Sequence, residues 1–190
     1  VPLLAPAHAA EPPCPGAPVV SLRLPHLRAA LEAGREAIIV ALGSSSTKGA
    51  MASAPGHSYP AELQAALAGA LPDQHFAIIN RGVGGQDAPE ELARLQTDVI
   101  AVRPQLVIWQ VGANGAMRHA DPVEFGRLVT EGVHRMQDAG IDVVLMDNQH
   151  CPKVDATPEG VLLDGVLGTV AKATGAGLFS FSGGIALAFS

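Results

Sequence analysis

Three short segments, each following an apolar run, carry the residue types of an acyl-transfer site. They read GSSSTKG after residue 42, NRGVGGQD after residue 79 and GANG after residue 111. A serine at the turn from a strand into a helix can be exposed as a nucleophile, and glycines let the backbone approach a ligand closely. The amide of Asn114 can donate to the same oxyanion as a glycine N–H. Together the segments predict nucleophilic attack by a serine, supported by oxyanion donors.

Each segment alone has a simpler interpretation. The first departs from the Walker spacing of a phosphate-binding loop, since Lys48 precedes Gly49, and it lacks the G-x-S-x-G pattern. The glycines of the second lack the G-x-G-x-x-G spacing of dinucleotide-binding proteins. Taken singly, the segments are typical of a helix cap or a tight turn. The catalytic interpretation therefore depends on all three lying together.

The intervening sequence predicts how the segments are positioned. Short apolar runs rich in β-branched residues are typical of strands buried on both faces of a parallel sheet, and the stretches between them have helical spacing. This alternation predicts a three-layer α/β fold of about five strands, with the ligand site at the carboxyl ends of the strands. The expected strands are 37–42, 76–80, 106–111, 141–147 and 177–181, and the expected helices are 59–70, 88–102, 122–139 and 157–174.

In this order and spacing, the segments ALGSSST, NRGVGGQ and WQVGANG resemble blocks I, II and III of the SGNH (GDSL-like) hydrolases, over residues 38–152. The resemblance implies a flavodoxin-like α/β/α sandwich and ester hydrolysis through a serine. It places the nucleophile on Ser45. It also places the oxyanion donors on Gly85, on Asn114 and on the N–H of Ser45 itself.

Three features depart from the pattern of that family. Ser44 stands where an Asp usually precedes the nucleophile, and Gly115 stands where an Asp usually follows the asparagine, so the network that holds the loops is expected to differ. The D-x-x-H motif that supplies the acid and the base follows the fifth strand in the family, where this sequence has no histidine. A literal D-x-x-H ends the fourth strand instead, which makes His150 a candidate base and Asp147 its partner. His57, a residue missing from this chain, or a second copy could supply the base instead.

Composition excludes several classes of function. The chain has 190 residues, a formal net charge of −6 and no cluster of Lys or Arg, which argues against a nucleic-acid-binding surface. Its longest apolar runs have about six residues, whereas a membrane-spanning helix requires about 20. Hydrophobic residues make up 48% of the chain and aromatic residues 4%, so a single domain with an aliphatic core is expected.

The two ends of the chain predict export and an incomplete domain. Residues 1–20 resemble a signal-peptide remnant and an extended leader, because an apolar stretch ends in the small-x-small pattern AHA. Residues 21–190 are expected to form one domain that lacks the usual C-terminal segment, since the apolar tail stops without a charge. Secretion or periplasmic export would allow Cys14 and Cys151 to pair, with two free buried thiols as the alternative. The apolar tail could also join two copies as a homo-oligomer.

The resulting expectation is a secreted serine esterase that hydrolyses short-chain, acetyl-type esters without a metal or an organic cofactor. Two alternatives stay open. A chain that keeps the fold and the oxyanion pocket without a base would be a binding module. An acyltransferase would use the same serine and pass the acyl group to a sugar hydroxyl instead of water. Nothing in the sequence identifies the alcohol portion of the ester.

Overall fold

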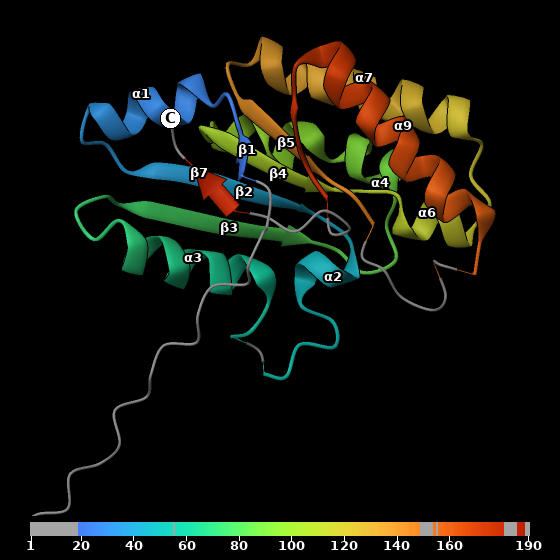
Figure 1. The fold of residues 1–190 in the computed structure, drawn as a ribbon, viewed down its shortest axis with the longest axis horizontal. Helices are drawn as coiled ribbons and strands as arrows, with labels where there is room; N and C mark the ends of the chain where they lie inside the picture. The colour runs from blue at the N-terminus through green and yellow to red at the C-terminus, as the bar shows by residue number, and fades with distance from the viewer. Residues whose placement is uncertain (1–18, 55, 149–153, 155, 181–185, 189–190) are drawn as a thin grey trace, which may run out of the picture.

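The computed structural model describes residues 19–54, 56–148, 154, 156–180 and 186–188. At its centre lies a five-stranded sheet in which all neighbouring strands are parallel, in the order β3-β2-β4-β5-β6 (Figure 1). Because β2 lies between β3 and β4, the carboxyl ends of these three strands are neighbours at the point where an α/β sheet binds its ligands. The strands are β2 (Ala37–Gly43), β3 (Phe76–Gly82), β4 (Leu106–Gln110), β5 (Asp142–Met146) and β6 (Gly177–Phe179).

Helices cover both faces of the sheet and complete three layers (Figure 1). One core contains residues of α4, α5, α7 and α9, and a second core, across the sheet, contains residues of α1 and α3. The expected α/β/α sandwich is therefore confirmed. A separate parallel pair joins β1 (Val19–Ser21) to β7 (Ala186–Ala188). The helices are α1 (Pro25–Glu32), α2 (Ser45–Lys48), α3 (Tyr59–Ala70), α4 (Ala88–Ala93), α5 (Leu95–Asp98), the 3-10 helix η1 (Ile100–Val102), α6 (Ala113–Met117), α7 (Pro122–Asp138) and α9 (Pro158–Thr174).

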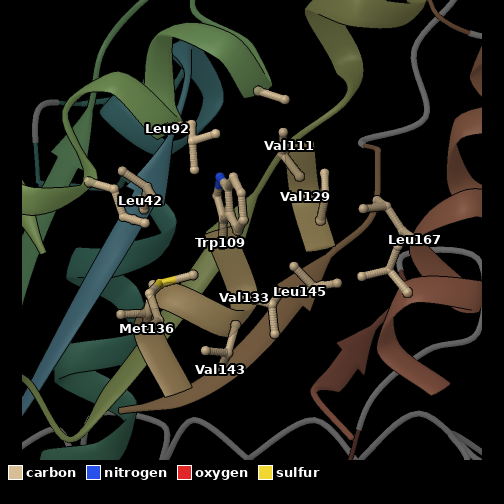
Figure 2. Packing of buried hydrophobic residues seen from close by; sticks show 14 of the residues in the cluster. Leu42, Leu92, Trp109, Val111, Val129, Val133, Met136, Val143, Leu145 and Leu167 are labelled. Carbon is tan, nitrogen blue, oxygen red and sulfur yellow. The ribbon is translucent and has the colours of Figure 1, made fainter. Parts of the chain in front are cut away.

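Successive residues of each strand enter the two cores alternately, because their side chains point to opposite faces of the sheet. In β2, Val40 belongs to the core under α7 and α9, whereas Ile39 belongs to the core under α1 and α3. Trp109 of β4 lies in the larger core, beside labelled residues such as Met136 (Figure 2). A Cβ at Gly132 of α7 would lie 2.5 Å from Cη2 of this ring, so the glycine lets the helix pack closely against it.

The structure confirms the expected strands and three of the four expected helices to within a few residues. The helix expected over residues 88–102 is wrong, because the chain breaks there into α4, α5 and η1. At the first break, Arg94 has φ −100° and ψ 4°, and its guanidinium donates to Gln86 Oε1, Asp98 Oδ2 and the Gly43 carbonyl. The bonds to Gln86 and to the Gly43 carbonyl lie outside the i,i+4 spacing of a helix, so they depend on the tertiary arrangement and had no local signal. Helix α1 was not expected, because it is short and buries only Leu27 and Ala30.

Several expectations concern the ends of the chain and the loop after β5. The leader expected over residues 1–20 lies, apart from its last two residues, outside the described part of the chain. Cys14, Cys151 and His150 also lie outside it, so their pairing and role stay predictions. Within the described ranges, no helix combines the length and the apolar character needed to cross a membrane.

A buried carboxyl group lies inside the larger core. Trp109 Nε1 donates to Glu91 Oε2 at 2.7 Å, and Glu91 is fully buried. Among the described residues, Glu91 Oε1 has no hydrogen-bond partner. Burial therefore raises the pKa of Glu91 to about 8, against the smaller opposing effect of the Trp109 hydrogen bond. The group stays protonated in the folded chain at neutral pH.

This pKa predicts that the folded state loses stability as the pH rises. Below about pH 4.5 Glu91 is protonated both folded and unfolded, whereas between about 4.5 and 8 only the unfolded chain ionises it, which favours unfolding by about 1.4 kcal/mol per pH unit. Glu91→Gln should flatten this slope. Urea unfolding followed by Trp109 fluorescence from pH 5 to pH 8 measures it, and equal slopes for both proteins would contradict the prediction.

Candidate active site

Ser45 begins the short helix α2 directly after the central strand β2. The preceding residue, Ser44, is buried, whereas Ser45 is half-buried. The helix ends at Gly49, whose φ of 102° is unfavourable for other residues. Within the described part of the chain, no residue hydrogen-bonds the Ser45 hydroxyl. The strand-to-helix turn places Ser45 at the carboxyl edge of the sheet.

Two polar side chains from neighbouring strands hold α2 in place. Gln110, the last residue of β4, accepts hydrogen bonds from the hydroxyls of Ser46 and Thr47, both at 2.8 Å. Asn80 of β3 donates from Nδ2 to the Thr47 carbonyl at 2.8 Å. Gly82 permits this close approach, since a Cβ there would lie 2.2 Å from the backbone nitrogen of Lys48. The nucleophile helix is thus anchored from both flanking strands.

The glycine loop after β3 lies beside Ser45. A Cβ at Gly84 would be 3.8 Å from Ser45 Cβ, which is ordinary contact distance. Gly85 has a φ of 80°, a conformation that glycine adopts without strain. The loop is joined to β2 by the Val83 N–H, which donates to the Gly43 carbonyl at 2.9 Å. The predicted oxyanion glycine therefore follows directly after a residue that lies beside the predicted nucleophile.

Asn114, in the first turn of α6, is tied to the same loop. Its Nδ2 donates to the Gln86 carbonyl at 2.8 Å, and a side-chain amide has a second N–H that can donate elsewhere. Directly after α6, Arg118 Nη2 donates to the Gly85 carbonyl, and its Nη1 donates to Glu90 Oε1 at 3.2 Å. The structure thus links the segments that carry Ser45, Gly85 and Asn114, as the three motifs required.

Asp147 lies apart from this cluster. It follows β5, which is separated from β2 by β4, so the lateral distance is roughly 10 Å at the usual strand spacing. Its carboxyl group is buried and accepts a hydrogen bond from the Ser180 hydroxyl. His150, its expected partner, lies outside the described residues. The other candidate base, His57, pairs through Nδ1 with Glu62 Oε1 at 2.7 Å, and both side chains are exposed.

Sequence reasoning missed the residues that hold the loops. Gln110 was visible as a polar residue within the apolar run LVIWQV, which signals a buried hydrogen-bonding role. Arginine side chains normally face solvent, so the bonds of Arg94 to the Gly43 carbonyl and of Arg118 to the Gly85 carbonyl had no sequence signal. In the described part of the chain, no three His, Cys, Asp or Glu side chains gather to hold a metal.

An apolar cavity lies elsewhere in the molecule, away from the three loops of the candidate site. A cavity of about 260 Å³ lies between α1, α3 and the sheet, and its described lining is apolar, from Leu22 and Leu24 to Phe179. Ser45, Gly85 and Asn114 are not among its described lining residues. The candidate catalytic residues lie instead on the loops at the carboxyl edge of the sheet.

Several solved structures with a similar arrangement of strands and helices are named esterases. The esterase AlinE4, described as an SGNH-hydrolase family esterase, is 27% identical, with a TM-score of 0.65 over 76% of this chain and 75% of its own. The psychrotrophic esterase EstA from Pseudoalteromonas sp. is 20% identical, with a TM-score of 0.66 over 76% of each chain. Axe2, an acetyl-xylooligosaccharide esterase from Geobacillus stearmophilus, is 18% identical, with a TM-score of 0.65 over 76% of this chain and 75% of its own. EstA and Axe2 are less than 25% identical to this chain, so they support its fold and not its activity.

A comparison with curated proteins found no match. A family model matches residues 14–181, which include every segment described above as part of the site. The match covers most of the chain and agrees with the SGNH-type fold of the solved structures. The chain belongs to the non-GDSL lipase-like family and is an SGNH-like hydrolase.

Proposed function

We propose that this ester hydrolase of the SGNH type cleaves short-chain acyl esters with Ser45 as its nucleophile. The observation that carries the proposal is the convergence of three loops, in which the glycine loop lies beside Ser45 and Asn114 donates a hydrogen bond to the same loop. Because Axe2 is named an acetyl-xylooligosaccharide esterase, acetyl esters are the first substrates to test. The SGNH-type neighbours support the class of reaction.

The reaction follows from the groups at the sheet edge. Ser45 Oγ attacks the ester carbonyl carbon and loses its proton to a base, which gives a tetrahedral oxyanion. The backbone N–H groups of Ser45 and Gly85 and the second N–H of the Asn114 amide donate to that oxygen. Collapse of the tetrahedral species expels the alcohol, which takes the proton from the base, and leaves an acyl-Ser45 ester. Water then attacks the acyl group and releases the carboxylic acid.

A fluorophosphonate probe tests whether Ser45 is activated. The probe phosphonylates a serine only when a base and oxyanion donors assist it, so peptide mapping should find the adduct on Ser45. Boiled protein controls for unspecific reaction. Absence of labelling, together with binding of an intact acetyl ester, would favour the catalytically silent binding module. An acyltransferase would be labelled as well, but it would yield acylated sugar when an acceptor is added.

The base is proposed to be His150, with Asp147 as the carboxylate that orients it. His150→Ala should then lower kcat for a chromogenic acetate ester by about 10²-fold or more, because an unassisted serine hydroxyl is a poor nucleophile. His57→Ala is the matched control and should leave kcat unchanged. The reverse result would assign the base to His57 and its partner Glu62. Full activity of both variants would point to a group supplied by another copy.

A further inference from the structure

A buried carboxylate connects the two loops that carry the oxyanion donors. Asp87 begins α4, two residues after Gly85, and is only 4% exposed. Its Oδ1 accepts a hydrogen bond from the Gly112 N–H at 3.2 Å, at the entrance to α6. Its own N–H donates to Glu90 Oε2 at 3.0 Å, as part of a capping box. Asp87 is therefore held at the start of α4 through its backbone N–H, while its side chain reaches across to the loop after β4.

The same carboxylate occupies the space of a side chain at position 115. A Cβ on Gly115 would lie 2.4 Å from Asp87 Oδ2, and 3.1 Å from its Cγ. Gly115 is buried within α6, and its neighbour in the chain is Asn114. A side chain at position 115 would therefore require the Asp87 carboxylate to move from the place where it accepts the Gly112 N–H. The absence of a side chain at Gly115 lets the glycine loop pack directly against the helix that carries the asparagine.

Two further contacts lie on either side of this junction. The Asn114 amide donates to the Gln86 carbonyl, and the Arg118 guanidinium donates to the Gly85 carbonyl. Both bonds hold carbonyl groups of the glycine loop, whereas Asp87 holds the backbone N–H of the opposite loop. Burial raises the pKa of the Asp87 carboxyl, while the N–H groups of Ala88 and Gly112 oppose that shift. The segment after β4 therefore donates hydrogen bonds both to carbonyl groups of the glycine loop and to the Asp87 carboxylate at its end.

We infer that Asp87 is a positioning residue that sets the separation between the Gly85 N–H and the Asn114 amide, and that Asp87 and Gly115 act as a matched pair. The inference rests on the proposed function, since those two groups are its oxyanion donors. Misplacement of a catalytic group by about 1 Å costs roughly 10²-fold in rate. The loss falls on the transition state because the donors act on the charge that develops there.

The test is a double-mutant cycle with four proteins. Asp87→Ala and Gly115→Ala should each lower kcat for an acetyl ester by about tenfold or more, with KM changed less than about twofold. The double variant should be no slower than Asp87→Ala alone, because removal of the carboxylate makes room for the added methyl group. Asp87→Asn keeps an acceptor for the Gly112 N–H and should recover most of the rate. The inference would be overturned if the loss of kcat in the double variant equalled the product of the two single losses. It would also be overturned if Asp87→Ala kept the kcat of the wild type.

A control separates positioning from general loss of stability. Asp121 also begins a helix with a proline in its first turn, and its Oδ1 accepts from the Glu124 N–H at 2.8 Å, but it belongs to α7 and is exposed. Asp121→Ala should lower the free energy of unfolding without changing kcat. The cycle is also measured by urea unfolding, where Asp87 and Gly115 should again be coupled. That coupling stands even if Ser45 proves not to be the nucleophile, so the two failures are distinguishable.

Discussion

Ser45→Ala should reduce hydrolysis of a chromogenic acetate ester to the background rate, a loss on the order of 10⁴-fold or more in kcat. The change removes one oxygen atom from a half-buried residue whose hydroxyl has no hydrogen-bond partner among the described residues. Its cost in folding should therefore be small, within about 0.5 kcal/mol. Initial rates and urea unfolding measure the two effects separately.

The control for this substitution is an exposed serine in the following loop. Ser53→Ala removes the same hydroxyl group from a position after α2 and should leave both kcat and fluorophosphonate labelling unchanged. A Ser45→Ala protein that still turns over the ester, with Ser53→Ala at the same rate, would exclude Ser45 as the nucleophile. Loss of turnover together with unfolding would require Ser45→Cys, which keeps a nucleophilic atom, as a second variant.

Asn114→Ala should lower kcat by about 10²- to 10³-fold, the usual cost of removing one oxyanion donor. KM should change much less, because the amide acts mainly on the charge of the tetrahedral species. The substitution also removes the bond from Nδ2 to the Gln86 carbonyl, so part of the loss could come from the loop. Steady-state kinetics over a range of substrate concentrations separates kcat from KM.

Arg118→Ala distinguishes the two contributions. It removes another bond between α6 and the glycine loop, at the Gly85 carbonyl, but it leaves all three proposed donors in place. We expect a smaller loss of kcat than for Asn114→Ala. Equal losses in the two variants would mean that Asn114 holds the loop and does not donate to the oxyanion.

Local patterns in the sequence predicted most of the fold. The strand-forming runs of β2, β4 and β5 alternate between two cores, and both cores are apolar, so these strands were visible as short continuous hydrophobic segments. The helices α7 and α9 begin with Asp121 and Thr157, whose side chains accept from the backbone of their first turns, each followed by a proline. Such signals depend only on neighbouring residues, and therefore they survive without tertiary information.

Long-range contacts decided what the patterns could not. Residues 88–102 have helical spacing throughout, yet Arg94 turns towards the Gly43 carbonyl, 51 residues away in the sequence, and the helix breaks. Gly115 was seen only as a departure from the family pattern. In the structure, the Asp87 carboxylate lies where a side chain of residue 115 would begin. No local rule relates these two residues, because they meet only when β3 and β4 flank β2.

The sequence by itself determined the sandwich and the three loops that carry Ser45, Gly85 and Asn114, because strand period, helix caps and glycine spacing are properties of adjacent residues. Only the tertiary structure decided how the loops are joined, through Gln110 beneath the nucleophile helix and Asp87 between the donors. The physical reason is that a hydrogen bond or a close contact between distant segments depends on where the sheet places their ends. The order of the strands in the sheet, which sets those places, follows from the packing of the whole chain.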